Sequence, residues 1–324
     1  MSKNRLLEIL EENKGKILSG NDLSDLLGIS RNAVWKGINA LKEEGHQIDS
    51  IKNKGYVLQV ESDNLSKSEI LMNLPESAPD YEIIILDEIP STNTYLKEHK
   101  DLANNTLVLA KAQTRGRGRL GKSFHSTDQG GIYLSLLKTK DISAYNTSLA
   151  TLASALAVSE VLDQYLGTPT SIKWVNDIYH EGYKLAGILT EGTLEFETGS
   201  LSSLIIGIGI NVNTEEFPEE IQSIASSLHR VTGKKYVRNE IVAGILSSLE
   251  KYLTLTRTDP RELIRSYRRR MLYLGEDILV IRGTEEIQGT LEDITDEGHL
   301  ILRTPKETLT LNSGEISIRK RERK

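Results

Sequence analysis

The sequence predicts an α+β protein of three parts, because the predicted type of secondary structure changes twice along the chain. Residues 1–60 are helix-rich and end in two short strands, residues 65–270 mix strands with helices, and residues 271–324 read as one strand after another. Polar turn formers at Ser62 mark the first boundary, and a helix with Pro260 in its first turn marks the second. The expected domains are 1–62, 63–270 and 271–324.

The composition excludes several classes of protein. A hydrophobic content of 38% and a charged content of 27% suit a globular chain. The absence of cysteine excludes disulfides and thiolate metal sites. The N-terminus is charged and has no apolar signal core, and no apolar run approaches the roughly 20 residues that span a bilayer. We therefore expect a cytoplasmic protein without membrane contact. The net charge of −6 confines any nucleic-acid contact to a local patch.

The N-terminal part is predicted to be a winged helix-turn-helix. Apolar residues within 6–10 indicate a first helix, and residues 22–27 indicate a second that ends at Gly28. Ser30 suits the N-cap of a third helix. The buried face of that helix should hold Val34, Ile38 and Leu41. Two strands joined through residues 53–55 would form the wing.

The start of the third helix and the wing favour DNA binding. A helix that begins with small polar and basic residues can enter the major groove, while a basic wing can contact phosphate. Winged helices also serve as protein docking units, and acidic residues leave this part close to neutral, so that alternative stays open. The candidate DNA contacts are Ser30, Arg31, Asn32, Lys36, Lys52 and Lys54.

The stretch QTRGRGRLGKSF, residues 113–124, places arginines on a glycine-rich backbone. Glycines let backbone N–H groups approach a ligand, and arginine forks bind phosphate or carboxylate. The pattern is neither a Walker loop nor a dinucleotide fingerprint. A disordered basic loop is the alternative. We expect a loop that is mobile when empty and ordered by an anion.

Two further stretches offer polar groups at the ends of strands. Ser91, Thr92 and Asn93 follow a strand and begin a helix, where free N–H groups and side-chain oxygens meet; a plain N-cap is the alternative. Residues 171–192 are expected to form a hairpin, with one strand to about Trp174, a turn at 180–182 and a return strand. These positions supply a partly desolvated Lys184 and, at the first strand's end, Asn176 and Asp177.

The stretch LIIGIGINVN, residues 204–213, alternates glycine with isoleucine. Gly207 and Gly209 would face the same side of one strand and leave a furrow for a flat apolar ligand. A β-bulge is the alternative account. Asn211 and Asn213 would continue the glycine face.

The segments STN, GRGRLGKSF, KWVNDI, KLAGILTE and GIGINVN, in this order behind a helix-turn-helix, resemble the biotin protein ligases. The resemblance covers nearly the whole chain and is greatest to the bifunctional kind that also represses biotin-synthesis genes. It implies a central domain of the class II synthetase-like biotin/lipoate ligase type. It also implies that the C-terminal strands form a small SH3-like barrel.

The resemblance implies a biotin–[acetyl-CoA-carboxylase] ligase. Such an enzyme joins biotin to ATP, with Mg²⁺, to make biotinyl-5′-AMP, and then passes the acyl group to a lysine of a biotin carrier domain. It further implies a homodimer when loaded with biotinyl-5′-AMP, and operator DNA as a second partner.

The family's site residues carry over by position. Its biotin pocket corresponds to Ser91, Thr92, Asn93, Gln113, Arg117, Gly118, Arg119 and Lys184, with Gly187, Gly207 and Gly209 against the ring and chain. Its nucleotide contacts correspond to Arg119, Lys122, Phe124, Asn176 and Asn211. Lys184 and Arg119 would be catalytic, and Asp177 could act through Mg²⁺. Lys122 and Phe124 stand where arginine and tryptophan are more common in the family. We therefore expect weaker hydrogen bonding to the anion and weaker ring stacking, but no loss of function.

Three rival interpretations stay open at this point. One is a lipoate or octanoate ligase, which shares the catalytic fold. Another is a ligand-sensing repressor without catalysis, against which the intact Arg119 and Lys184 argue. The third is a ligase whose helix-turn-helix no longer binds DNA.

Overall fold

The computed structural model describes residues 2–60, 62–128, 130–140, 147–194, 201–312 and 316–320. Two compact units make up the chain: Met1–Leu74 with Tyr236–Ala243, and Pro75–Lys235 with Gly244–Lys324. A compact unit can hold more than one domain, so this division does not test the domain boundaries. The domains 1–62, 63–270 and 271–324 therefore stay a prediction.

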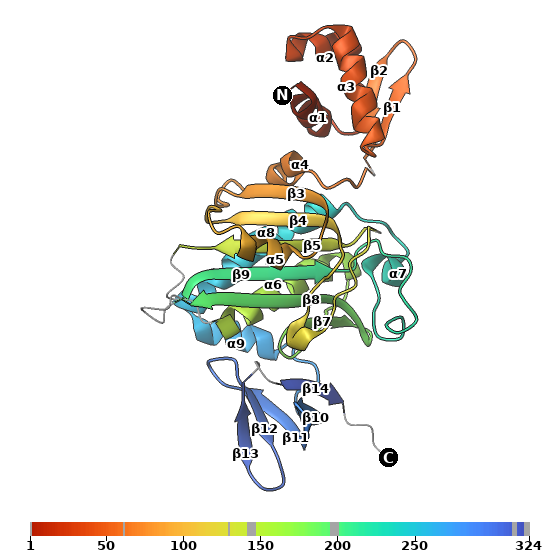
Figure 1. The fold of residues 1–324 in the computed structure, drawn as a ribbon. Coiled ribbons are helices and arrows are strands. Elements are labelled where there is room, and N and C mark those ends of the chain that lie inside the picture. Colours follow the sequence, from red (N-terminus) through yellow and green to blue (C-terminus); the bar gives the residue numbers. More distant parts are fainter. Residues whose placement is uncertain are drawn as a thin grey trace. The chain divides into compact units, whose positions relative to one another are not determined.

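The first unit is a winged helix-turn-helix, as predicted (Figure 1). Ser19 and Ser30 accept hydrogen bonds from Asp22 N and Ala33 N and so cap α2 and α3, and Gly28 ends α2 at φ 63°. Val34, Ile38 and Leu41 of α3 are buried. The elements are α1 (Ser2–Glu12), α2 (Gly20–Leu27), α3 (Arg31–Glu43), β1 (Ile48–Ile51), β2 (Gly55–Leu58) and α4 (Lys67–Met72).

A polar network fixes the segment after the wing within this unit. Arg238, at the start of α8 (Arg238–Thr258), donates from Nε to Asp63 Oδ2 over 2.9 Å. Asn239 Oδ1 accepts from the Ser66 N–H, and its Nδ2 donates to Glu69. Glu69 also pairs with Lys14 at 2.6 Å. Buried charges that are paired in this way hold residues 63–69 in one conformation.

The second unit contains a seven-stranded sheet in the order β3-β4-β5-β9-β8-β7-β6. The β3–β4 pair is parallel and the other pairs are antiparallel. The strands are β3 (Glu82–Ile89), β4 (Thr106–Gln113), β5 (Ile132–Lys138), β6 (Ser171–Lys173), β7 (Asp177–His180), β8 (Tyr183–Leu194) and β9 (Leu201–Ile210).

Helices cover this sheet. Helix α6 (Thr147–Leu166) packs on β8 and β9 and is buried along most of its length, because it is apolar nearly all round. Helix α5 (Thr92–Glu98) packs on β4, β5 and β9, and Figure 1 shows it in front of the sheet with α6 behind. The remaining helices are α7 (Leu228–Thr232), α8 and α9 (Pro260–Arg268).

The predicted two-stranded hairpin at 171–192 is wrong in one respect. The turn at 181–182 is present, but a second turn at 174–176 separates β6 from β7, so the segment forms three strands. Asn176 therefore lies in a tight turn, and Asp177 begins a new strand. Short strands with an apolar turn between them have no Gly or Pro signal, which is why the pattern hid the division.

The five C-terminal strands form an antiparallel sheet in the order β13-β12-β11-β10-β14. Trp174 Nε1 donates to the Gly298 carbonyl beside this sheet over 3.1 Å. Edges β13 and β14 are not paired with each other among the described residues, so barrel closure stays a prediction. The strands are β10 (Asp277–Arg282), β11 (Glu285–Ile294), β12 (Leu300–Arg303), β13 (Thr308–Leu311) and β14 (Ile316–Lys320).

Directly opposed residues of neighbouring strands form a line across one face of the central sheet. Directly opposed residues of antiparallel strands share a face. The line, here called the glycine row, runs from β5 through β9, β8 and β7 to β6 and consists of Tyr133, Gly209, Gly187, Asp177 and Lys173.

Candidate active site

A cavity of about 850 Å³ lies on the face of the glycine row. Every residue to which a biotin or nucleotide contact was assigned from the sequence lines this cavity. These are Ser91, Thr92, Asn93, Gln113, Arg117, Gly118, Arg119, Lys122, Phe124, Asn176, Lys184, Gly187, Gly207, Gly209 and Asn211, together with Asp177. The structure thus brings together four stretches that are far apart in the sequence, while the individual roles stay predictions.

The start of α5 forms a polar end of the cavity. Ser91 caps the helix, and Thr92 N donates to Gln113 Oε1 over 2.8 Å. Ser135 Oγ lies 2.6 Å from Thr92 Oγ1 and 2.5 Å from Asn93 Oδ1. Amide and hydroxyl groups in one network present both donors and acceptors, which suits a ligand with a compact polar head.

Glu191, which sequence reasoning missed, joins this polar end to residues 113–124, here called the arginine loop. Its carboxylate accepts from Asn93 Nδ2 over 2.8 Å and from Lys97 Nζ over 2.7 Å, and lies 3.4 Å from Arg117 NH1. Burial raises the pKa of Glu191, but the bonds from Lys97 and Asn93 and the charges of Lys97 and Arg117 outweigh it, so the pKa is lowered. The sequence signal that could have revealed Glu191 is the alternation of faces along a strand. Glu191 lies two residues after Leu189 and four after Gly187, so it faces the same side of the sheet as the glycine row.

The arginine loop is a small hairpin with a short helical turn at Arg119–Gly121. Phe124 N donates to Gly116 O over 2.9 Å, and Gly118 N donates to Lys122 O over 2.7 Å. A Cβ on Gly116 would lie 2.3 Å from Phe124 O, so only glycine permits this closure. Mobility of the empty loop stays a prediction.

The glycine furrow predicted on β9 is present, and it is filled by side chains of the protein. The β9 register is regular through Gly207 and Gly209, which excludes a bulge there. A Cβ on Gly207 would lie 2.1 Å from Asn93 Oδ1, and one on Gly209 would lie 2.6 Å from the Phe124 ring. The glycines therefore let helix α5 and the Phe124 ring approach the strand.

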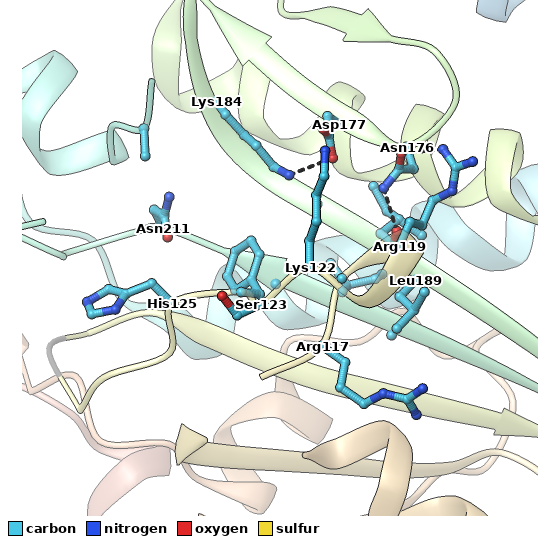
Figure 2. A pocket seen from close by; sticks show the side chains of 18 of the residues that line it. Arg117, Arg119, Lys122, Ser123, His125, Asn176, Asp177, Lys184, Leu189 and Asn211 are labelled. Atoms are coloured by element: carbon cyan, nitrogen blue, oxygen red, sulfur yellow. Dashed lines mark hydrogen bonds and ion pairs between the residues drawn. The ribbon is translucent and has the colours of Figure 1, made fainter. Parts of the chain in front are cut away.

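Positive charge gathers beyond the furrow. Lys184 Nζ lies 2.6 Å from Asp177 Oδ1, and Arg119 NH1 donates to Asn176 Oδ1 over 3.1 Å (Figure 2). Figure 2 shows the Lys122 side chain extending toward Asp177. Burial lowers the pKa of Arg119 and Asp177 opposes this shift, yet a guanidinium stays charged at neutral pH.

Two more cations line the cavity and were not predicted: Lys173 and Arg319. Lys173 ends β6, and its ammonium lies 5.6 Å from the centre of the Tyr179 ring. Arg319 comes from β14, at the far end of the sequence. Lys173 could have been found as the lysine that ends a strand before the Asn176-Asp177 pair, whereas only the tertiary fold reveals Arg319.

The asparagines after β9 separate in the structure. Asn211 lines the cavity and donates from Nδ2 to Ser226 O over 3.0 Å. Asn213 is buried and does not line the cavity, and its place on the glycine face stays a prediction. Its strand has ended at Ile210, and the period of two stops there.

In the part of the chain that the structure describes, Asp177 is the one carboxylate that lines the cavity. Among the described residues there is no group of three His, Asp or Glu side chains that could hold a metal ion. One carboxylate suits Mg²⁺ that is held mainly by phosphate oxygens and water, and it does not suit a cation bound by protein alone.

The predicted DNA contacts of the first unit lie on its surface. Ser30, Arg31, Asn32 and Lys36 of α3 and its cap are exposed, as are Lys52 and Lys54 of the wing. Trp35, which was not predicted as a contact, is also 53% exposed on α3. None of the described helices is long and apolar enough to cross a membrane.

Comparison with known proteins agrees with this arrangement. Residues 85–211 match the model of the biotin/lipoate A/B protein ligase family, residues 3–57 match an HTH domain, and residues 273–319 match the biotin protein ligase C-terminal domain.

Two curated relatives match over nearly the full length. The Bifunctional ligase/repressor BirA of Bacillus subtilis (strain 168) is 36% identical over 97% of each chain, and that of Escherichia coli (strain K12) is 28% identical over 95% of each chain. The solved biotin protein ligase from Aquifex aeolicus in complex with biotin and ATP is 34% identical, with a TM-score of 0.66 over 74% of this chain and 99% of that chain.

Identity above 30% over nearly the whole of both chains, in three matched segments, confirms the resemblance seen in the sequence motifs. The chain belongs to the biotin protein ligase family, among its bifunctional ligase/repressors.

Proposed function

We propose that this protein activates biotin with ATP to biotinyl-5′-AMP, transfers the biotinyl group to a lysine of a biotin carrier protein, and represses biotin genes when loaded. The observation that carries the catalytic proposal is the single cavity in which the polar end, the glycine row and the cations meet. Such a cavity fits a molecule with a compact polar head, an apolar body and a carboxylate.

Biotin would lie along the glycine row. Its ureido head would replace the hydrogen bonds at the start of α5. Its ring and chain would lie on the furrow once the Phe124 ring, which packs on Gly209, moves aside. The carboxylate would then reach Lys184, whose Nζ lies 3.1 Å from where a Cβ on Gly187 would be. Lys184 would exchange its bond to Asp177 for one to substrate, and the Asp177 carboxylate would then be available to Mg²⁺.

Adenylation brings two anions together, so positive charge at the meeting point lowers the barrier. A biotin carboxylate oxygen attacks the α-phosphorus, a new O–P bond forms, and pyrophosphate leaves with the electron pair of the broken P–O bond. Lys184, Arg119 and Lys122 would stabilise the charge that develops on the phosphoryl oxygens. Phe124 would stack on the adenine, and Asn176 and Asn211 would hold the nucleotide.

Transfer follows in the same cavity. The neutral amine of the carrier lysine attacks the acyl carbon, the bond to the phosphate oxygen breaks, AMP leaves with the electron pair of that bond, and the nitrogen gives up one proton to solvent. Arg119 and Lys184 would polarise the mixed anhydride during this attack. The arginine loop would shield the anhydride from water until the carrier lysine enters.

Mg²⁺ fits the site as a partner of the ATP phosphates. Asp177 would contribute one carboxylate oxygen, and the ion would neutralise phosphate charge. Acid groups elsewhere in the lining are absent among the described residues, so the phosphates themselves would supply the other ligands.

The test supplies biotin, ATP labelled on the α-phosphate, Mg²⁺ and a purified biotin carrier domain. The expected result is biotin-dependent release of pyrophosphate, labelled biotinyl-5′-AMP, and then a biotinylated lysine. Lipoate and octanoate serve as competing acids and should not be adenylated. Adenylation of lipoate in preference to biotin would replace this proposal with its nearest rival.

For repression, the exposed basic surface of α3 and the wing would contact operator DNA. Biotinyl-5′-AMP would favour a homodimer, which places two recognition helices on a two-fold operator. Sedimentation and gel shifts, each with and without biotin plus ATP, test this step. Equal mobility of the DNA in both conditions would contradict ligand-dependent repression.

A further inference from the structure

We infer that Lys173 is a catalytic residue of adenylation that binds the departing pyrophosphate. This inference rests on the proposed ligase function and deepens it, because it assigns a group to the β- and γ-phosphates of ATP. It follows from the order of groups along the glycine row, from the charges around that row, and from the direction in which a leaving group must depart.

The glycine row gives the cavity a direction. The polar end lies over β4, β5 and β9, where Gln113, Ser135 and Gly207 meet the start of α5. The row then passes Gly209 beneath the Phe124 ring, Gly187 beneath the Lys184 ammonium, and Asp177, and it ends at Lys173. Since neighbouring strands lie about 4.8 Å apart, Lys173 is roughly 14 Å from Gly209.

The chemistry of phosphoryl attack has the same direction. The attacking and leaving oxygens lie roughly in line on opposite sides of the α-phosphorus. A carboxylate that arrives from the polar end and stops at Lys184 therefore expels its leaving group toward the end of the row at β6. Lys173 is the cation that ends this row.

Among the described residues no ion pair holds the Lys173 ammonium, as is also true of Lys122 and Arg319, whereas the cations nearer the polar end are held. Lys184 pairs with Asp177, Arg119 bonds Asn176, and Arg117 lies near Glu191. By contrast, the contact recorded for the Lys173 ammonium is an aromatic ring. Its cross-strand partner Asp177 already carries the ion pair with Lys184.

The surroundings of Lys173 favour an incoming anion. Burial lowers its pKa, and Lys184, Lys122 and Arg319 lower it further, while Asp177 opposes them. A cation held partly desolvated among other cations is stabilised when a polyanion binds. Pyrophosphate, which gains negative charge as the P–O bond breaks, would interact more strongly than ground-state ATP, and this difference is what accelerates the step.

The experiment separates the two half-reactions of the full-length protein. Lys173→Gln should slow formation of biotinyl-5′-AMP about 100-fold, the loss typical of one oxyanion donor. In the reverse direction, its KM for pyrophosphate should rise by about tenfold or more. Transfer from chemically synthesised biotinyl-5′-AMP to a carrier domain should stay within about twofold of the parent, because pyrophosphate takes no part in it.

Two further variants keep the result interpretable. Lys173→Arg retains a positive charge and should recover most of the adenylation rate, which ties the loss in Lys173→Gln to the missing charge. The unchanged transfer step of Lys173→Gln shows that this variant is folded. Lys251→Gln removes an exposed lysine of α8 that pairs with Glu160 and should leave both half-reactions unchanged.

The outcomes distinguish this inference from the proposed function. Equal losses in both half-reactions, or an unchanged KM for pyrophosphate, would overturn the role of Lys173 and leave the ligase proposal standing. Failure of the unsubstituted protein to form biotinyl-5′-AMP would instead overturn the ligase proposal itself.

Discussion

The cavity and the recognition helix α3 both use lysine and arginine, but under opposite physical conditions. In the cavity, Lys184 and Arg119 are partly or largely buried and are held by Asp177 and Asn176. On the first unit, Arg31 and Lys36 are exposed to water. Buried cations act on a bound group with little screening, whereas exposed cations act through counterion release and weaken with salt. One chain can therefore carry two anion-binding functions that respond differently to solution conditions.

The largest expected effect follows from replacing a buried cation of the cavity. Lys184→Gln should slow formation of biotinyl-5′-AMP about 1,000-fold, because a desolvated charge at the reacting carboxylate has no substitute. A pyrophosphate-release assay measures this. Lys251→Gln serves as the matched lysine control on the same unit. DNA binding by the unloaded chain should be unaffected, and a loss there would mean that the two cation sets are not independent.

Next in size is the effect of crowding the furrow. In Gly209→Ala the new Cβ would lie 2.6 Å from the Phe124 ring, which must then move off the strand. Overpacking of this kind costs about 1–3 kcal/mol, so the KM for biotin should rise by roughly fivefold to 150-fold. Gly244→Ala is the control, since its Cβ would make ordinary 3.5 Å contacts with Val161. An unchanged KM in Gly209→Ala would contradict a ligand lying on this furrow.

Salt dependence sharpens the comparison on the exposed side. Lys36→Gln should weaken DNA binding uniformly across sequences and reduce the slope of log K against log salt by about 1. Lys67→Gln, an exposed lysine on α4, should leave the slope unchanged. Fluorescence titrations with a labelled duplex at several salt concentrations give the slope. A slope for Lys36→Gln equal to the parent's would remove Lys36 from the DNA interface.

The smallest expected effect is at Glu191, which joins the two polar parts of the cavity. Glu191→Gln keeps an oxygen for Asn93 but loses the charge that holds Lys97 and Arg117. Partly exposed pairs contribute about 0–1 kcal/mol, so release of biotinyl-5′-AMP should accelerate only a few-fold. Lys111→Gln, which breaks a pair with Asp87 elsewhere on the sheet, should not change release.

Acid titration of the same variant tests the sign of this effect. The pKa of Glu191 is lowered from 4.5 in the folded protein, so its ion pairs stabilise the fold above that pH. This stabilisation is lost as the pH falls through the lower folded value. Glu191→Gln should therefore lose less stability than the parent below pH 4.5, as followed by circular dichroism.

The sequence predicted most of the fold and about half of the residues that line the cavity. Caps such as Ser30 and Ser91, the helical spacing on α3 and the paired glycines of β9 are short-range signals that the structure confirms. Lys173 and Glu191 were missed because their positions, at the end of one strand and on one face of another, are weak signals until the cross-strand register is known. A letter pattern cannot show that Lys173 lies opposite Asp177 once an unmarked turn divides the strands.

The two tryptophans offer a natural optical label for each function. Trp35 sits half in solvent on α3, while Trp174 is only 3% exposed and immediately follows Lys173. An indole in water emits at longer wavelength than one in an apolar interior, so the emission spectrum of the intact chain holds two separable components. Changes at the long-wavelength edge, from Trp35, would report DNA binding. Changes at the short-wavelength edge, from Trp174, would report ligand binding in the cavity near β6, without any dye attached.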